Sequence, residues 1–428
     1  MRWTDEAVGA GPPTGHGALR HAPPRPGTGR PEPPGTGRAL AGAAPGAEPL
    51  GGGPALRAAA CGYWARRGLA TAREQVAAAP GGAPLLLALA AALGGDLLLP
   101  RPCPAWWLPQ APLLGRTAHP VATPAECGGV PDPYALWETV RRIRDEGGDP
   151  RLLVLAVVDD PTGTAAPPEL LHEAVTAATE AGLHVVSDET WRDTVHPVPA
   201  GRAPVLAGPA GMLPAEVTVL TDLAGALLPG GWPVAVARFP ATDRGAVLHD
   251  EVLDVLAGIG AVLAAPVAAA AAHALAEPEE VVAQAVDAAR VHGRLAAALH
   301  GVLRTAGALA LPPCGGRQLY ADLGPLGEAL AARGVGDAQE LEDHLTGLLG
   351  FPVPGGHRFG DDPAALRVRL DTAAFLGATA PERTASLTAA DPLDVPAVRD
   401  AVTMFAAVLD GLRADARRAD AQRRERPR

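Results

Sequence analysis

The stretches VVDDPTG (157–163) and VVSDETW (185–191) decide the fold of this 428-residue chain. Each closes an apolar strand with polar residues, and the segment between them, 168–181, has the spacing of apolar residues that is typical of an amphipathic helix. A strand, a helix and a second strand in this order form a right-handed crossover with parallel strands. The pattern therefore predicts an α/β fold with a mainly parallel central sheet and strands at 152–158 and 183–187.

Further elements extend this unit on both sides. A helix is predicted at 55–67, strands at 217–220 and 234–239, a mostly helical region at 252–302 and a final helix at 397–414. Between the last two regions, short strands and helices alternate. This layout predicts a large α/β domain and a smaller α+β C-terminal domain.

The predicted boundaries place the large domain at 50–295 and the small domain at 296–414, with the N-terminal segment contributing to the small domain. Residues 1–49 are rich in Pro, Gly and Arg. Such a segment buries too little apolar surface to offset its ordering entropy, so we expect it to be disordered. Residues 415–428 are expected to form a basic tail.

The overall composition excludes several classes of function. The net charge of −11 and pI near 5.6 argue against nucleic acid as a main partner, because phosphate binding needs a basic surface. The four cysteines are far apart with no CxxC spacing, which predicts neither a metal site nor disulfides. The most apolar run, 85–99, is too short to span a bilayer. With a mean hydropathy of +0.11, we expect a cytoplasmic protein without a membrane partner.

Together, the order and spacing of several segments resemble the class I and II aminotransferases, the fold type I enzymes that use pyridoxal phosphate. These segments are the DPTG turn at 160–163, the VVSDETW stretch at 185–191, the GPALR run at 53–57 and the C-terminal stretches GGHRFG (355–360) and LRVRL (366–370). The resemblance runs from about 50 to about 411. It implies an aminotransferase-like large domain and a small C-terminal domain.

The resemblance also implies roles for three residues that follow the two predicted strands. Asp188 stands where the family has the aspartate that pairs with the pyridine nitrogen of the cofactor and keeps the ring an electron sink. Read from the local sequence alone, Asp188 is equally a helix-cap or turn residue. Asp160 stands in place of an Asn that donates to the cofactor's phenolic oxygen, and an ionised carboxylate has no such donor. Trp191 stands where many members have a Tyr.

The greatest departure concerns the lysine that holds the cofactor as a Schiff base and moves the proton. Its position falls on Gly225, and the whole chain contains no lysine. Thr221 or Asp222 stands for the serine that holds the phosphate, although an aspartate there would repel a phosphate dianion. Pro233 aligns with the arginine that clamps the phosphate.

Two other binding elements are altered in the same way. The phosphate-cradling turn before a helix survives as PGGAP (80–84), where the backbone N–H groups of Gly82 and Ala83 are the expected anion contacts. A plain glycine-rich helix start is the alternative. Pro104 aligns with the aromatic residue that stacks on the ring, and Trp106 or Trp107 is either its substitute or a core residue.

The resemblance assigns the grip on the substrate carboxylate to Arg369, by a bidentate pair. Arg367 is the alternate candidate, because side chains two apart on a strand share one face. A solvated strand arginine is the other interpretation.

Three readings follow. The first is an aminotransferase-like protein that has lost transamination because it has no catalytic lysine. Such a protein binds pyridoxal phosphate noncovalently if at all. Its role is then to bind an amino acid or keto acid, or to modulate a partner protein. The second is an enzyme with lysine-free chemistry, in which His184 and His196 move protons. The third is an unrelated α/β binding protein. Because aminotransferases commonly dimerise, we expect a homodimer or a heterodimer with a lysine-bearing relative.

Overall fold

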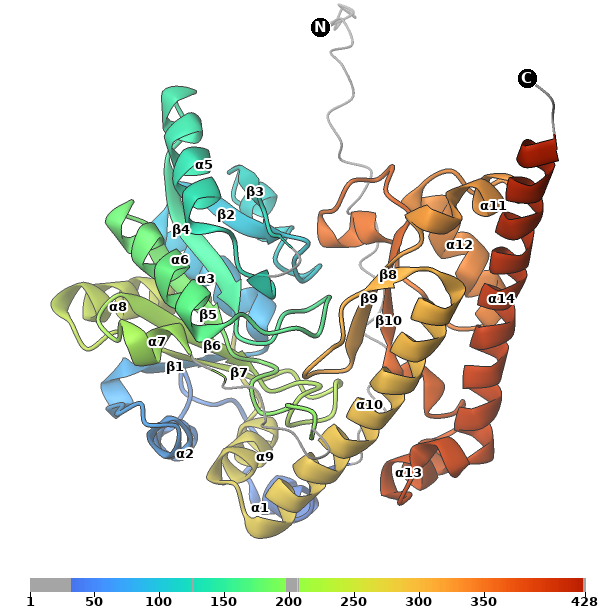
Figure 1. Ribbon diagram of the computed structural model, residues 1–428. Helices are drawn as coiled ribbons and strands as arrows, with labels where there is room; N and C mark the ends of the chain where they lie inside the picture. Colours follow the sequence, from blue (N-terminus) through green and yellow to red (C-terminus); the bar gives the residue numbers. More distant parts are fainter. Residues whose placement is uncertain (1–31, 125–126, 198–205, 207, 426–428) are drawn as a thin grey trace, which may run out of the picture.

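The computed structural model describes residues 32–124, 127–197, 206 and 208–425, and it forms two bodies (Figure 1). The larger body is built on a seven-stranded sheet and the smaller on a three-stranded sheet. The long helix α10 (Glu279–Ala306) runs from the first body to the second (Figure 1). The predicted α/β fold with a second, smaller α+β unit is confirmed.

The central sheet has the strand order β1-β7-β6-β5-β4-β2-β3. The run from β6 to β3 is parallel, and only β7 is antiparallel to its two neighbours, β1 and β6. The strands are β1 (Val76–Ala79), β2 (Asp96–Arg101), β3 (Ala118–Ala122), β4 (Pro150–Ala156), β5 (His184–Asp188), β6 (Val217–Asp222) and β7 (Ala235–Arg238). The mainly parallel sheet is therefore as predicted.

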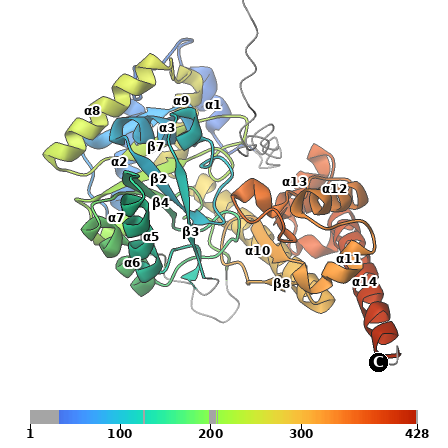
Figure 2. The same cartoon turned by 90° about the horizontal axis from the view of Figure 1, so that it is seen from above.

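Helices cover both faces of the sheet, which is why β5 and β6 are buried along their whole length. Val185 and Val186 are neighbours on β5, yet they belong to different apolar clusters, as side chains that alternate across a strand must. One cluster includes α2 (Pro54–Arg66), α5 (Pro133–Asp145), α6 (Pro168–Glu180) and α9 (Ala265–Ala276); the other includes α3 (Gly82–Leu93), α4 (Gln110–Leu113) and α8 (Asp243–Gly258). Figure 2 shows the two layers from above.

Local sequence explains why these helices begin where they do. The Asp132 side chain accepts a hydrogen bond from Ala135 N at 2.9 Å, and Pro133 occupies the first position of α5, where a missing N–H costs nothing. Thr242 caps α8 in the same way through Gly245 N. The short helix α7 (Pro209–Met212) likewise begins at a proline.

The N-terminal region differs from its prediction. Residues 36–42, expected to be disordered, form α1 (Thr36–Gly42), which packs against α9 in the large body. The ring Nε2 of His273 on α9 lies 2.8 Å from the Pro34 carbonyl oxygen. The small alanine side chains of α9 allow this close approach, so this segment packs on the large body. The preceding residues, 1–31, lie outside the described part of the chain.

The small body pairs β10 (Arg367–Asp371), β9 (Gln318–Asp322) and β8 (Leu309–Ala310) in an antiparallel sheet. Its core joins α10 to aromatic residues such as Phe375 and Phe405. The remaining helices are α11 (Gly327–Ala331), α12 (Ala338–Leu349), α13 (Ala380–Thr388) and α14 (Pro396–Glu425), with 3₁₀ turns at Arg73–Gln75, Gly324–Leu326, Gly356–Phe359, Thr372–Phe375 and Pro392–Asp394.

The C-terminal end also differs from its prediction, because α14 continues as a helix to Glu425 through most of the expected basic tail. Arg333 Nε pairs with Asp415 Oδ2 at 3.1 Å and ties this extension to the small body.

None of the described helices is long and apolar enough to cross a membrane. The described residues hold no group of three or more side chains of the kind that bind metals.

Candidate functional site

Asp188 ends β5 at the carboxyl edge of the sheet, and its side chain is only 5% exposed. Its Oδ1 accepts a hydrogen bond from Thr190 N at 2.9 Å, and its Oδ2 accepts one from the indole Nε1 of Trp107 at 3.3 Å. Burial raises the pKa of Asp188 to about 7, and the Asp222 carboxylate adds to this increase, while the two hydrogen bonds oppose it. Asp188 is thus a buried acid that already faces an N–H donor from the chain itself.

The two tryptophans next to Asp188 come from the loop after β2. Trp107 is fully buried and meets Trp106 edge to face, with ring centroids 6.0 Å apart. Trp106 lies against the start of α3: a Cβ on Gly82 would be 3.0 Å from its ring atom Cη2. The loop therefore brings one indole to Asp188 and the other to Gly82. Trp107 is a core residue and also the partner of Asp188.

The N-terminus of α3, where the sequence predicts a phosphate cradle, holds a carboxylate. Gly82 N donates to Asp222 Oδ2 at 3.0 Å, and Ala224 N donates to Asp222 Oδ1 at 3.0 Å. A helix N-terminus stabilises negative charge, and here the charge comes from the chain itself. Ala83 adds no hydroxyl. Pro233 lies beside the cradle, with its Cβ 3.7 Å from where a Cβ on Gly81 would stand, so no cation takes the aligned arginine position.

Thr221, the other candidate for the phosphate serine, is buried in β6, and its Oγ1 finds no hydrogen-bond partner among the described residues. Arg238, near the aligned arginine in sequence, ends β7 and donates to the Pro214 carbonyl at 3.2 Å. The Gly82 N–H donates to Asp222 and to neither of these residues. The carboxylate of Asp222 is therefore the group that satisfies the start of α3.

Gly225, at the position of the missing lysine, lies in a tight turn. Its φ is +91°, a conformation that favours glycine, and its N–H donates to Leu228 O at 2.7 Å. Gly225 lines a cavity of about 30 Å³ together with Trp191 and Arg317. The guanidinium of Arg317 lies 5.0 Å from the Trp191 ring centroid. A cavity of this size holds about one water molecule. Trp191 and Arg317 therefore lie close together, with almost no free space between them.

Asp160 and Arg369 pair with each other across the two bodies. Arg369 Nε lies 3.0 Å from Asp160 Oδ1, and both side chains are largely buried. Arg369 also lies 3.8 Å from an Asp371 oxygen and 5.5 Å from the Phe359 ring centroid. The arginine that the resemblance assigns to a substrate carboxylate is therefore bound to a carboxylate of the chain.

Arg367, the alternate candidate, shares a face of β10 with Arg369 but has different partners. Its Nη1 contacts both oxygens of Asp361 at 3.0 and 2.8 Å, and its Nε donates to Asp322 Oδ2 at 3.0 Å. Neither arginine is the solvated strand residue of the alternative interpretation.

His184 and His196, the proposed proton carriers, do not meet at Asp188. The His184 Nε2 lies 2.8 Å from Thr218 Oγ1 at the far end of β5, and burial lowers its pKa to about 4. The His196 Nε2 lies 2.9 Å from Gly316 O, and burial lowers its pKa too. The structure thus gives both rings structural contacts and gives neither a bond to Asp188.

Sequence reasoning did not single out two buried charged residues, Asp159 and Arg317. Asp159 precedes Asp160 in the turn after β4 and is 2% exposed; burial, together with Asp160 and Asp188, raises its pKa to about 7. Arg317 follows a double glycine and pairs with Asp371 at 3.7 Å. For Asp159, its position next to the DPTG turn was a sequence feature that could have indicated a role. For Arg317, the sequence contains no such feature.

These groups do not fit pyridoxal phosphate as an aminotransferase holds it. The N–H of Gly82 is bonded to Asp222, the carboxyl of Asp188 is bonded to Trp107, and no lysine exists to form the Schiff base. An added phosphate dianion would meet the Asp222 carboxylate at close range.

Comparison with known proteins supports the resemblance. The sequence profile of the family "Aminotransferase class I and II" matches residues 44–370. Among solved structures, an aspartate aminotransferase from Thermus thermophilus with maleate is similar, with 22% identity, a TM-score of 0.70 and coverage of 88% of each chain. N-Succinyldiaminopimelate aminotransferase from Mycobacterium tuberculosis has 23% identity and a TM-score of 0.69, covering 88% of this chain and 90% of its own. At these identities the structures show the fold. No curated protein sequence matches the chain significantly.

Proposed function

Because the chain belongs to the class I and II aminotransferase family, whose members depend on pyridoxal phosphate, we propose that it is a member that does not transaminate. In this proposal the chain has filled the cofactor site with its own side chains. The observation that carries it is the Asp222 carboxylate, which takes the Gly82 N–H at the start of α3 at 3.0 Å. Side chains of the protein also occupy two other groups of the site: Trp107 donates to Asp188, and Asp160 pairs with Arg369.

The absence of lysine supports the proposal independently. An amine is needed to hold the cofactor covalently and to pass the proton in amino-group transfer, and arginine is too strongly basic to replace it. The chain has 36 residues that are lysine or arginine, and all of them are arginine. The positions that would receive phosphate and ring are engaged, so any pyridoxal phosphate that binds does so noncovalently, after displacing Asp222 and Trp107.

The test is to mix the purified chain with pyridoxal phosphate and to record its absorbance before and after dialysis, beside a lysine-bearing aminotransferase as positive control. We expect no protein-bound band after dialysis, and no release of keto acid from amino-acid donors. Isothermal titration with pyridoxal phosphate and pyridoxamine phosphate then measures noncovalent binding. A dialysis-resistant band, or transfer of amino groups at an ordinary enzymatic rate, refutes the proposal.

We also infer that the chain assembles as a dimer, either with itself or with a lysine-bearing relative, because aminotransferases commonly do so. Native mass spectrometry of material purified from the natural source measures this. Recovery of the homodimer alone counts against the mixed dimer, and recovery of monomer counts against both.

A further inference from the structure

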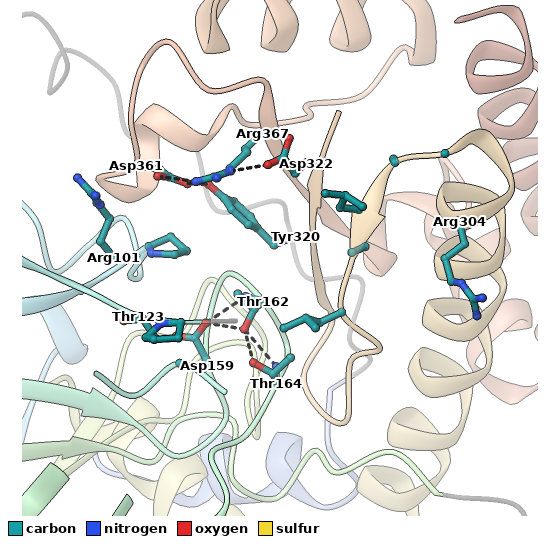
Figure 3. A pocket seen from close by; sticks show the side chains of 18 residues that line it. Arg101, Thr123, Asp159, Thr162, Thr164, Arg304, Tyr320, Asp322, Asp361 and Arg367 are labelled. Atoms are coloured by element: carbon teal, nitrogen blue, oxygen red, sulfur yellow. Dashed lines mark hydrogen bonds and ion pairs between the residues drawn. The ribbon is translucent and has the colours of Figure 1, made fainter. Parts of the chain in front are cut away.

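A cavity of about 730 Å³ lies between the two bodies (Figure 3). Sites for small molecules usually occupy roughly 300–1,000 Å³, so its size suits an organic ligand. Asp188, Gly82, Gly225 and Arg369 do not line it. The cavity is therefore separate from the groups that the family resemblance assigns to the cofactor and the substrate carboxylate, and an inference about it does not depend on the proposed function.

The large body contributes a buried carboxyl group to this cavity. Asp159 Oδ2 accepts hydrogen bonds from Thr162 Oγ1 at 2.6 Å and Thr162 N at 3.3 Å, and Thr164 Oγ1 lies 2.6 Å from Thr162 Oγ1 (Figure 3). Both of these hydrogen bonds to the Asp159 carboxyl group go to Oδ2, and neither goes to Oδ1. The backbone allows this placement only because residue 129 is glycine: a Cβ there would be 2.5 Å from the Asp159 Cβ.

The small body contributes a cluster in which acidic groups outnumber the basic one. Arg367 lies between Asp361 and Asp322, with contacts of 2.8 to 3.0 Å, and Tyr320 donates its hydroxyl to Asp361 Oδ2 at 2.9 Å. Figure 3 shows this cluster on the opposite side of the cavity from Asp159. Because two carboxylates already surround the guanidinium, a further carboxylate from a ligand meets repulsion there.

An apolar wall closes the third side. Leu309 and Leu311, at β8 and just after it, line the cavity while 61% and 37% exposed. Exposed leucines at the edge of a cavity are typical of surfaces that cover an apolar part of a ligand. The two other arginines of the lining do not offset the negative charge inside the cavity. Arg101 lies at the edge, and Arg304 points away from the other labelled side chains (Figure 3).

The lining therefore offers more hydrogen-bond acceptors than donors to a ligand. Its threonine and tyrosine hydroxyls are engaged within the protein, whereas Oδ1 of Asp159 receives neither of the hydrogen bonds that Thr162 donates to this carboxyl group. From this geometry we propose that the cavity binds an amine that carries an apolar body and no carboxylate, with the ammonium at Asp159 and the apolar body against Leu309 and Leu311. An ammonium at this place favours the ionised form of Asp159 and so compensates for the burial of its charge.

Isothermal titration of the full chain with three probes of the same apolar skeleton tests this proposal: isoamylamine, isoamyl alcohol and leucine. We expect isoamylamine to bind at least about tenfold more tightly than the alcohol, a difference that one charge-assisted hydrogen bond supplies. Leucine, which adds a carboxylate to the amine, is expected to bind more weakly than isoamylamine.

The variant Asp159→Asn should lower the affinity for isoamylamine to that for the alcohol and leave the alcohol unchanged. The exposed Asp145→Asn on α5 is the matched control and should change neither. If Asp159→Asn does not fold, Leu309→Arg places a cation on the exposed wall and should abolish amine binding. The proposal is overturned if leucine binds as tightly as isoamylamine, if Asp159→Asn or, in its place, Leu309→Arg leaves amine binding intact, or if no heat of binding is seen up to about 10 mM amine.

Discussion

Replacing Trp107 with Phe isolates the bond between the indole and the buried acid. Phenylalanine keeps an aromatic ring in the core but removes the N–H that reaches Asp188 Oδ2 at 3.3 Å. The folded pKa of Asp188 is about 7, above the ordinary aspartate value of 3.8, because burial disfavours the charge. Asp188 is thus mostly protonated in the folded chain at mildly acidic pH and mostly ionised at alkaline pH.

The expected effect therefore depends on pH. A hydrogen bond to a charged acceptor contributes about 1.5–3 kcal/mol and one to a neutral acceptor about 0.5–1.5 kcal/mol, and a length of 3.3 Å favours the lower figures. Removing the N–H should thus destabilise the ionised form by about 1 kcal/mol more than the neutral form, which raises the pKa of Asp188 by about 0.7 units. A group with a raised folded pKa loses stability as pH rises through that pKa, and a further increase in the pKa enlarges this loss.

The assay is urea unfolding of the wild type and of Trp107→Phe at about pH 5.5 and about pH 8.5, on either side of the folded pKa. We expect the variant's deficit in unfolding free energy to be larger by about 1 kcal/mol at the higher pH. Other titrating groups are shared by both proteins and cancel in the difference. Trp106→Phe is the matched control, because no hydrogen bond joins its ring to Asp188, and its deficit should not vary with pH. Equal deficits for Trp107→Phe at both values would refute the reasoning.

Three further changes test the other internal partners. Gly225→Lys alone should gain no pyridoxyl mass after incubation with pyridoxal phosphate and borohydride reduction, since Asp222 still holds Gly82; a gain in mass would contradict this. Asp222→Ala should lower the unfolding free energy by about 2–4 kcal/mol, because buried N–H groups lose a charged acceptor, and added inorganic phosphate should restore stability to this variant and not to the wild type in a thermal melt. Asp160→Asn should cost about 1–2 kcal/mol by removing the counter-charge of Arg369, measured by urea unfolding, and an unchanged midpoint would show that the pair contributes nothing.

The fold could be predicted because its signals are local. Alternating and continuous apolar runs identify β4 and β5, and the glycines and prolines around them mark the turns. The ends of the chain could not be predicted from composition alone: α1 packs against the alanine-rich α9, and α14 packs against α11 and pairs with Arg333 through Asp415. Both depend on contacts between distant segments.

The sequence predicted on which elements the residues of the candidate site lie, but it did not predict which partners their side chains contact. The sequence placed Asp188, Gly82 and Arg369 at their elements, and it identified Asp222 as unsuited to a phosphate. It did not indicate that Asp222 itself binds Gly82, because a side chain's acceptor role across 140 residues depends on how β6 meets α3.

The three internal partners are not equivalent barriers to the cofactor. Trp107 is neutral and can be displaced by repacking, and the charge of Asp160 is balanced by its pairing with Arg369. Asp222 adds a like charge: at about 4 Å and an effective dielectric constant of about 20, each unit of phosphate charge meets about 4 kcal/mol of repulsion, or about 8 kcal/mol for a dianion. That is roughly six orders of magnitude in affinity, more than a restored lysine contributes by tethering. A return to cofactor chemistry therefore has to begin with the loss of the Asp222 carboxylate, before any lysine at position 225 has an effect.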